Sequence, residues 1–169
     1  RVLPTAHLAR TRAPRHLLPV PFPPPETVPH EILNAFHHHY HQTLRAHTSL
    51  GQTLYRERGI TEEGIRLCGL GYADGSAMQA LLSHADQRQE AQDIGLLSAT
   101  GRERLWQRLT IPECTQAQCC WMIGRTLEQP TPGKRSPKYL GLSLSKPLLG
   151  YHLARQRVRE RQLIRAILV

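Results

Sequence analysis

The sequence lacks a long apolar run. No uninterrupted apolar stretch reaches the roughly 18 residues of a membrane-spanning helix, and prolines and arginines break every apolar stretch near the first residue. The pattern therefore contains neither a spanning segment nor the apolar centre of a signal peptide. We expect a soluble, cytoplasmic protein that has no membrane partner.

Acidic residues are also scarce. The chain has 13 Asp and Glu against 22 Lys and Arg, which gives a formal net charge of +9 at pH 7. From Lys134 onward the only acid is Glu160, and no carboxylates have the close spacing that holds two Mg²⁺ ions. This balance is unsuited to metal-assisted phosphoryl transfer. It suits a protein that holds phosphates, and it attracts nucleic acid first and an anionic membrane surface second.

Common catalytic and metal-binding fingerprints are missing. The chain has no G-x-S-x-G, no P-loop and no G-x-G-x-x-G, and residues 69–71 are interpreted as a turn. No two pairs of cysteines have the C-x-x-C spacing of a zinc ribbon, so we expect free thiols at Cys68, Cys114, Cys119 and Cys120. Cys114 and Cys119 flank a short turn and could approach each other, and a cytosolic setting would keep them reduced.

A histidine run offers a different metal hypothesis. His37 and His41 are four residues apart, so both project from the same side of a helix. Zinc needs a third and usually a fourth ligand, and the adjacent residues His37, His38 and His39 cannot all face one ion. A solvated helix face is the favoured interpretation, and no metal is expected in this chain. A histidine-based metal enzyme stays open as a rival that metal analysis would separate.

The pattern along the chain predicts a linker followed by an α+β domain. Residues 1–29 hold eight of the 13 prolines and no acid before Glu26, so we expect a Pro-rich basic linker. Residues 30–169 form the domain, which begins with a helical half. The first expected helix covers residues 30–47. A short helix follows a break at Gly51 and ends at Gly59, and a third is capped by Thr61 and runs to about Leu67. Two more helices are expected over residues 75–83 and 86–94.

The second half is expected to contain a small mixed or antiparallel sheet with a basic loop. Its strands cover residues 109–114, 118–127 and 139–144, with a hairpin turn at 115–117. A helix over residues 148–162 and a strand over 163–169 complete the domain. If that last apolar strand is left unpaired, it is an edge prone to association.

Basic side chains cluster around the expected loop. Lys134, Arg135 and Lys138 precede Tyr139, Lys146 follows it, and Arg125 ends a strand behind a glycine. These cations could contact phosphate oxygens while the ring of Tyr139 or Trp121 stacks on a base. For any single residue, a solvated basic face is the alternative interpretation.

Seven segments in matching order and spacing resemble bacterial and phage DNA primases. The most informative are Ile123-Gly124-Arg125, similar to the end of the family's G-F-G-G-R turn, and Pro137-Lys138-Tyr139-Leu140, which matches its P-K-Y-L. The others are residues 55–60 (Y-x-x-R-G-L in the family), 65–73, 95–97, 104–112 and 146–151.

The resemblance implies the amino-terminal subdomain of the primase RNA-polymerase core, which precedes the Toprim fold. This part of the family lines a basic cleft that holds single-stranded DNA template and the nascent RNA primer during DNA replication. It implies binding roles for Arg58, Arg125, Lys138, Tyr139 and Lys146, whereas Arg108 is either a binding residue or an anchor of the sheet. A replicative helicase would bind through other regions of the enzyme.

The chain also departs from the family. Gly141 stands where the family has Asn, and residues 121–124 read Trp-Met-Ile-Gly in place of G-F-G-G. The family's E-G and D-x-D acids, which bind Mg²⁺ for two-metal nucleotidyl transfer, would follow Val169, so this chain alone is expected to make no primers. The rival is a non-catalytic single-stranded nucleic-acid-binding protein of a mobile element. A coding sequence that continues past Val169 into those acids would favour the primase.

Overall fold

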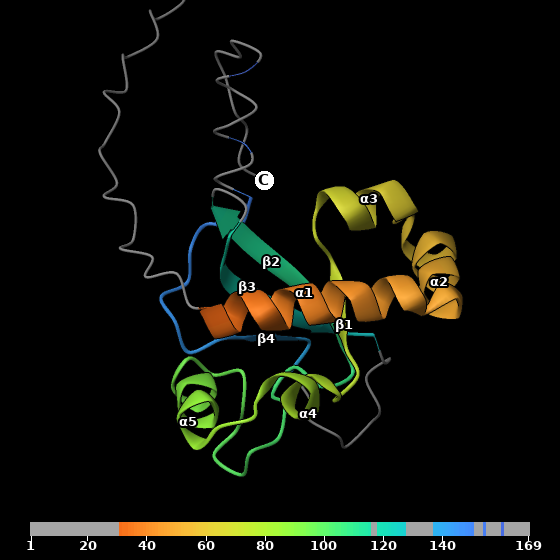
Figure 1. Ribbon diagram of the computed structural model, residues 1–169. Helices are drawn as coiled ribbons and strands as arrows, with labels where there is room; N and C mark the ends of the chain where they lie inside the picture. Colours follow the sequence, from red (N-terminus) through yellow and green to blue (C-terminus); the bar gives the residue numbers. More distant parts are fainter. Residues whose placement is uncertain (1–30, 116–117, 128–136, 151–153, 155–159, 161–169) are drawn as a thin grey trace, which may run out of the picture.

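The computed structural model describes residues 31–115, 118–127 and 137–150, together with residues 154 and 160 (Figure 1). The expected linker over residues 1–29 and the final strand over 163–169 lie outside the described residues. So do most of the expected helix over 148–162 and two of the three residues of the predicted hairpin turn.

The first helix, α1 (Glu31–Ala46), is the longest in the described part of the chain. Its apolar stripe points inward, and the side chains that form it are fully or almost fully buried: Leu33, Phe36, Tyr40 and Leu44. Figure 1 shows α1 crossing the sheet, with α2 and α3 near one end and α4 and α5 below it. The predicted helix over residues 30–47 is therefore confirmed.

Two short helices follow, α2 (Thr48–Arg58) and α3 (Glu62–Leu67). Gly59 ends α2 with a φ of 67°, a conformation that glycine adopts without strain, and Thr61 caps α3 by accepting a hydrogen bond from the Gly64 N–H at 3.0 Å. The predicted break at Gly51 is wrong, because α2 runs through this residue and the chain interrupts its helix at His47 instead. A glycine inside a helix lowers the stability of the helix by about 1 kcal/mol. This cost is too small to end a helix whose other residues pack against the rest of the protein.

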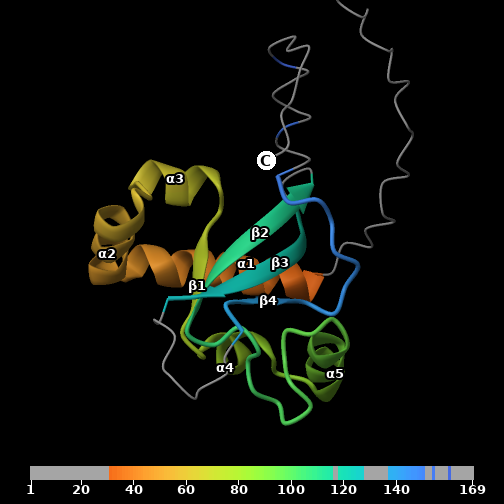
Figure 2. The ribbon, with the colours of Figure 1, turned by 180° about the vertical axis from the view of Figure 1, so that it is seen from behind.

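The helices α4 (Ala77–Leu81) and α5 (Ala85–Asp93) confirm the two predicted over residues 75–83 and 86–94. The sheet has four antiparallel strands in the order β1 (Gly71–Ala73), β2 (Arg108–Thr115), β3 (Gln118–Thr126) and β4 (Tyr139–Gly141). Figure 2 shows the long β2–β3 pair from behind, with β4 beside β3. This architecture confirms the α+β class and an antiparallel sheet.

The edge strand β1 is missing from the sequence-based expectation, which placed a turn at residues 69–71. Only Gly69 has the positive φ of such a turn, at 59°, whereas Gly71 pairs with Thr110 of β2. A Cβ at Gly71 would lie 2.7 Å from the Tyr40 backbone carbon, so this glycine lets β1 pass directly against α1. At the other edge, β4 ends at Gly141, three residues before the predicted end at residue 144.

A buried polar network joins α1 to the loop before β2. The Tyr40 hydroxyl donates to Oε2 of Glu103 at 3.0 Å, and the backbone N–H of Met78 donates to Oε1 at 2.9 Å. Burial, together with the nearby Glu103 carboxyl, raises the pKa of Tyr40 well above its ordinary value, so its hydroxyl stays a donor. Within the described residues, no helix is both long and apolar enough to cross a membrane.

We expect Tyr40→Phe to lower the free energy of unfolding by about 1–3 kcal/mol, because Glu103 would lose a donor inside the core. Urea denaturation measures this change. Tyr55→Phe is the matched control, since Tyr55 is 61% exposed and its hydroxyl should matter by less than about 0.5 kcal/mol. Equal losses in the two variants would contradict the role given to the network.

Candidate nucleic-acid interface

The pairing of β3 with β4 brings three predicted residues together. Arg125 lies directly opposite Tyr139 in the antiparallel register, so both side chains project from the same face of the sheet. The Cζ of Arg125 is 5.7 Å from the centre of the Tyr139 ring, and the Nζ of Lys138 is 5.9 Å from it. Both cations lie within the range of a cation–π interaction. Arg125, Lys138 and Tyr139 are called the Tyr139 platform below.

The platform is accessible and basic. Tyr139 is 46% exposed and Lys138 is exposed, whereas Arg125 is half-buried. Among the described residues, no carboxylate forms an ion pair with either cation. The buried Nε of Arg125 also has no hydrogen-bond partner there. A buried donor on a cation without a partner is uncommon in folded proteins and is satisfied well by an anion such as a phosphate.

Arg108 holds the platform in place. This residue begins β2, is only 7% exposed, and donates from Nη1 to the Pro137 carbonyl at 2.8 Å. The Thr126 N–H donates to the Lys138 carbonyl at 3.0 Å, which adds a second tie to the same segment. These contacts favour the anchoring role for Arg108 over direct binding of a ligand.

Gly124 makes room for this anchor. A Cβ at Gly124 would lie 2.9 Å from the Arg108 Cδ and 2.9 Å from the Leu105 Cδ2, so any larger residue would push Arg108 aside. Residues 123–125 lie within β3, which confirms the strand predicted over residues 118–127. The two residues therefore have complementary roles: Gly124 leaves room for the Arg108 side chain, and Arg125 forms part of the platform.

The other predicted binding residues that the structure describes make no hydrogen bond, ion pair or ring contact with the platform. Arg58 is exposed at the end of α2, and Lys146 is exposed beyond β4, with no hydrogen bond or ion pair to the platform. Lys134 and Arg135 lie outside the described residues. Trp121 was offered as a second stacking ring, but it is 2% exposed and buried in the core, so that prediction is wrong.

Gly141 and Trp121, two positions at which the chain departs from the family pattern, lie next to each other in the structure. A Cβ at Gly141 would lie 2.7 Å from Cζ2 of Trp121, so the indole fills the space into which a larger residue at position 141 would extend. The tryptophan at position 121 and the glycine at position 141 are thus mutually dependent.

Two members of the histidine run do not lie on the solvated face that we expected, whereas His38 is exposed. His37 and His41 are half-buried, and their rings donate hydrogen bonds to backbone carbonyls, from Nε2 to Gly69 at 3.0 Å and from Nδ1 to Leu70 at 2.7 Å. Burial lowers the pKa of His37, which favours its neutral form. Sequence reasoning missed that His37 lies close to Cys114 and Cys119. The sequence showed only that the histidine run and the cysteine pair were each possible metal ligands, and it gave no sign that they lie together.

The described residues offer no cluster of carboxylates that suits Mg²⁺. Mg²⁺ prefers several oxygen ligands, and no cluster of three or more carboxylates is present in this part of the chain. The buried acids Glu103 and Glu113 accept hydrogen bonds instead, from Tyr40 and Met78 and from the Gly150 N–H. No catalytic step is therefore assigned to these residues.

Comparison with solved structures identifies this fold. The structure of the DnaG catalytic core matches with a TM-score of 0.64 and 23% identity, covering 76% of this chain and 44% of that chain. A DNA primase domain from Pseudomonas aeruginosa matches with a TM-score of 0.61 and 28% identity, with the same coverage of both chains. The DnaG primase catalytic domain bound to single-stranded DNA has a TM-score of 0.61 and 20% identity, over 75% of this chain and 44% of that chain.

The described fold is thus that of a DnaG-type primase RNA polymerase domain, as the sequence resemblance implied. The chain spans less than half the length of these three structures. A scan of protein-family models and a search of curated protein sequences each give no match.

We expect Arg108→Met to lower the free energy of unfolding by about 1–3 kcal/mol, because the variant keeps most of the side-chain packing but loses the donor to Pro137. The Thr126 amide should then exchange with deuterium faster, since β4 would be held less firmly. Hydrogen-exchange mass spectrometry measures this. Arg66→Met is the control, because Arg66 only pairs with Glu63 on the surface. Unchanged exchange at Thr126 would contradict the anchoring role.

Proposed function

We propose that this chain is the amino-terminal, pre-Toprim part of a DNA primase RNA polymerase domain and supplies its surface for single-stranded template and primer. The fold shared with DnaG primases supports the assignment. One structure with this fold is a primase catalytic domain bound to single-stranded DNA, and others are complexes of the Mycobacterium tuberculosis domain with double-stranded DNA. Nucleic acid is therefore the natural partner for the basic surface of this chain.

The Tyr139 platform is the observation that carries the proposal. Recognition of a single strand needs cations for the phosphates and an exposed ring on which a base stacks. The platform combines these groups within about one side-chain length, because Arg125 and Lys138 both lie within 6 Å of the half-exposed Tyr139 ring. The unpartnered Nε of Arg125 is a donor in position for a phosphate oxygen.

Bond formation belongs to another part of the proposed enzyme. Two-metal nucleotidyl transfer requires carboxylates that hold Mg²⁺ against the reacting phosphates. Among the described residues, no cluster of three or more carboxylates is present. In this division of labour the platform positions the strand, and the carboxylates that act on it lie elsewhere in the polypeptide.

We expect the full chain to bind a single-stranded oligonucleotide with an affinity that falls steeply as salt rises. Arg125→Ala and Lys138→Ala should each reduce the slope of log K against log[salt] by about 0.7, the value for one phosphate contact with a single strand. Fluorescence anisotropy across a salt series measures both slopes. Arg66→Ala removes one positive charge on α3, away from the platform, and should leave the slope unchanged.

The ring should contribute separately from the charges. Tyr139→Ala should weaken binding by about 1–3 kcal/mol at constant salt, whereas Tyr139→Phe should bind like the unaltered chain because stacking needs the ring and not the hydroxyl. Tyr55→Ala is the matched control, because it removes an exposed tyrosine on α2 that is not part of the platform. The proposal fails if the platform variants bind as tightly as these controls, or if the chain does not bind single strands at low ionic strength.

A further inference from the structure

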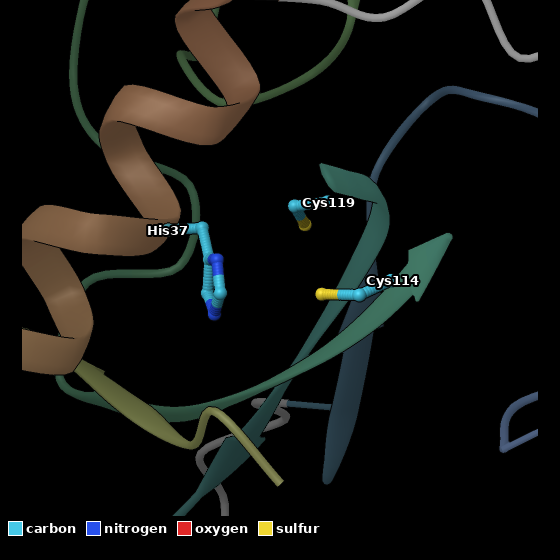
Figure 3. Close-up of side chains that lie close together, drawn as sticks. All are labelled: His37, Cys114 and Cys119. Atoms are coloured by element: carbon cyan, nitrogen blue, oxygen red, sulfur yellow. The ribbon is translucent and has the colours of Figure 1, made fainter. Parts of the chain in front are cut away.

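A second cluster of functional side chains lies at the opposite end of the sheet's long hairpin. The imidazole of His37 and the thiols of Cys114 and Cys119 offer ligand atoms that all lie within 4.8 Å of one another. They come from α1, β2 and β3, and Figure 3 shows the ring facing the two cysteine side chains. The three side chains share one buried or half-buried position, which the proposed strand-binding role does not use.

The fold brings these residues together through two independent contacts. Cys114 and Cys119 are direct cross-strand partners in the β2–β3 register, so their side chains share one face. Asn34 lies one turn before His37 on α1, and its Oδ1 accepts a hydrogen bond from the Cys119 N–H at 2.6 Å. This bond fixes the start of β3 against the same part of the helix that carries His37.

The hydrogen bonding of His37 prepares its other nitrogen to act as a ligand. Because Nε2 donates to the Gly69 carbonyl at 3.0 Å, a neutral ring has its lone pair on Nδ1. This Nδ1 is buried and has no hydrogen-bond partner among the described residues. Histidines that bind metals show the same arrangement, in which the second ring nitrogen is held by a carbonyl or carboxylate that fixes the tautomer.

We infer that His37 Nδ1 and the Sγ atoms of Cys114 and Cys119 form a binding site for a zinc-class cation. Imidazole and thiolate are the ligands that Zn²⁺ prefers, whereas Mg²⁺ and Ca²⁺ require oxygen. On binding, the two thiols release their protons to solvent, and the thiolates neutralise the charge of the divalent ion. Cys119 then gives up its present hydrogen bond to the Trp121 carbonyl.

Three neighbouring candidates among the described residues have other contacts or surroundings. Cys120 donates from Sγ to the Glu113 carbonyl at 3.2 Å, Cys68 is exposed at the end of α3, and His41 donates to the Leu70 carbonyl. Three protein ligands leave one tetrahedral position for water, and His37 joins the helix to both strands of the hairpin. A bound ion would therefore fasten α1 to the hairpin end and stabilise the folded chain by mass action.

The test uses the full chain, fully reduced and freed of metal, and titrates it with Co²⁺ as a spectroscopic substitute for Zn²⁺. We expect about one ion per chain, a near-ultraviolet thiolate-to-cobalt charge-transfer band that Zn²⁺ abolishes by displacement, and a higher melting temperature with either ion. Cys114→Ser should remove most of the band and weaken Co²⁺ binding by at least roughly tenfold. His37→Gln should weaken binding comparably.

Matched variants distinguish Co²⁺ binding at this site from adventitious Co²⁺ binding at other cysteines or histidines. Cys120→Ser and Cys68→Ser should keep the band, and His41→Gln should bind Co²⁺ like the unaltered chain. Cys119 is buried, so Cys119→Ser could impair folding. The test therefore compares Co²⁺ binding by the unaltered chain with binding by the variant of the half-buried Cys114. Binding without a thiolate band, a band that survives Cys114→Ser, or equal loss in Cys120→Ser would each overturn the inference, as would the absence of binding.

Discussion

The hydrogen bond from Arg108 to the Pro137 carbonyl is the contact on which the proposed site depends. The strand β4 contains only three residues, and so short a pairing is weak by itself. The buried guanidinium fixes the chain immediately before Lys138, so Tyr139 remains opposite Arg125. Gly124 permits this contact because a side chain there would collide with Arg108. One basic residue is thus used inside the protein to position the basic residues that face outward.

The helix α1 performs a similar task for the rest of the molecule. Its apolar stripe covers the sheet, Tyr40 reaches the buried Glu103, and Gly71 lets β1 approach the helix backbone closely. The same helix presents Asn34 and His37 to the hairpin end. The inferred metal site and the Tyr139 platform therefore share a scaffold but use different faces and different chemistry.

Local patterns predicted most of the helices and the main hairpin. The spacing of Leu33 and Tyr40, the left-handed glycine at position 59 and the Thr61 cap act within a few residues, so sequence alone reveals them. Sequence reasoning missed β1 because three residues that begin with glycine carry almost no strand signal. It also could not show that Trp121 fills the space beside Gly141, or that His37 meets Cys114 and Cys119, since these contacts join residues distant in the sequence.

The central claim is that a single strand lies on the Tyr139 platform. The most direct test is a titration of isotopically labelled chain with a short single-stranded oligonucleotide, followed by NMR of its backbone amides. The account predicts that the largest shifts occur at Arg125, Lys138 and Tyr139, with smaller ones along β3. Shifts confined to α2 and α3, with the platform amides unchanged at saturation, would contradict it.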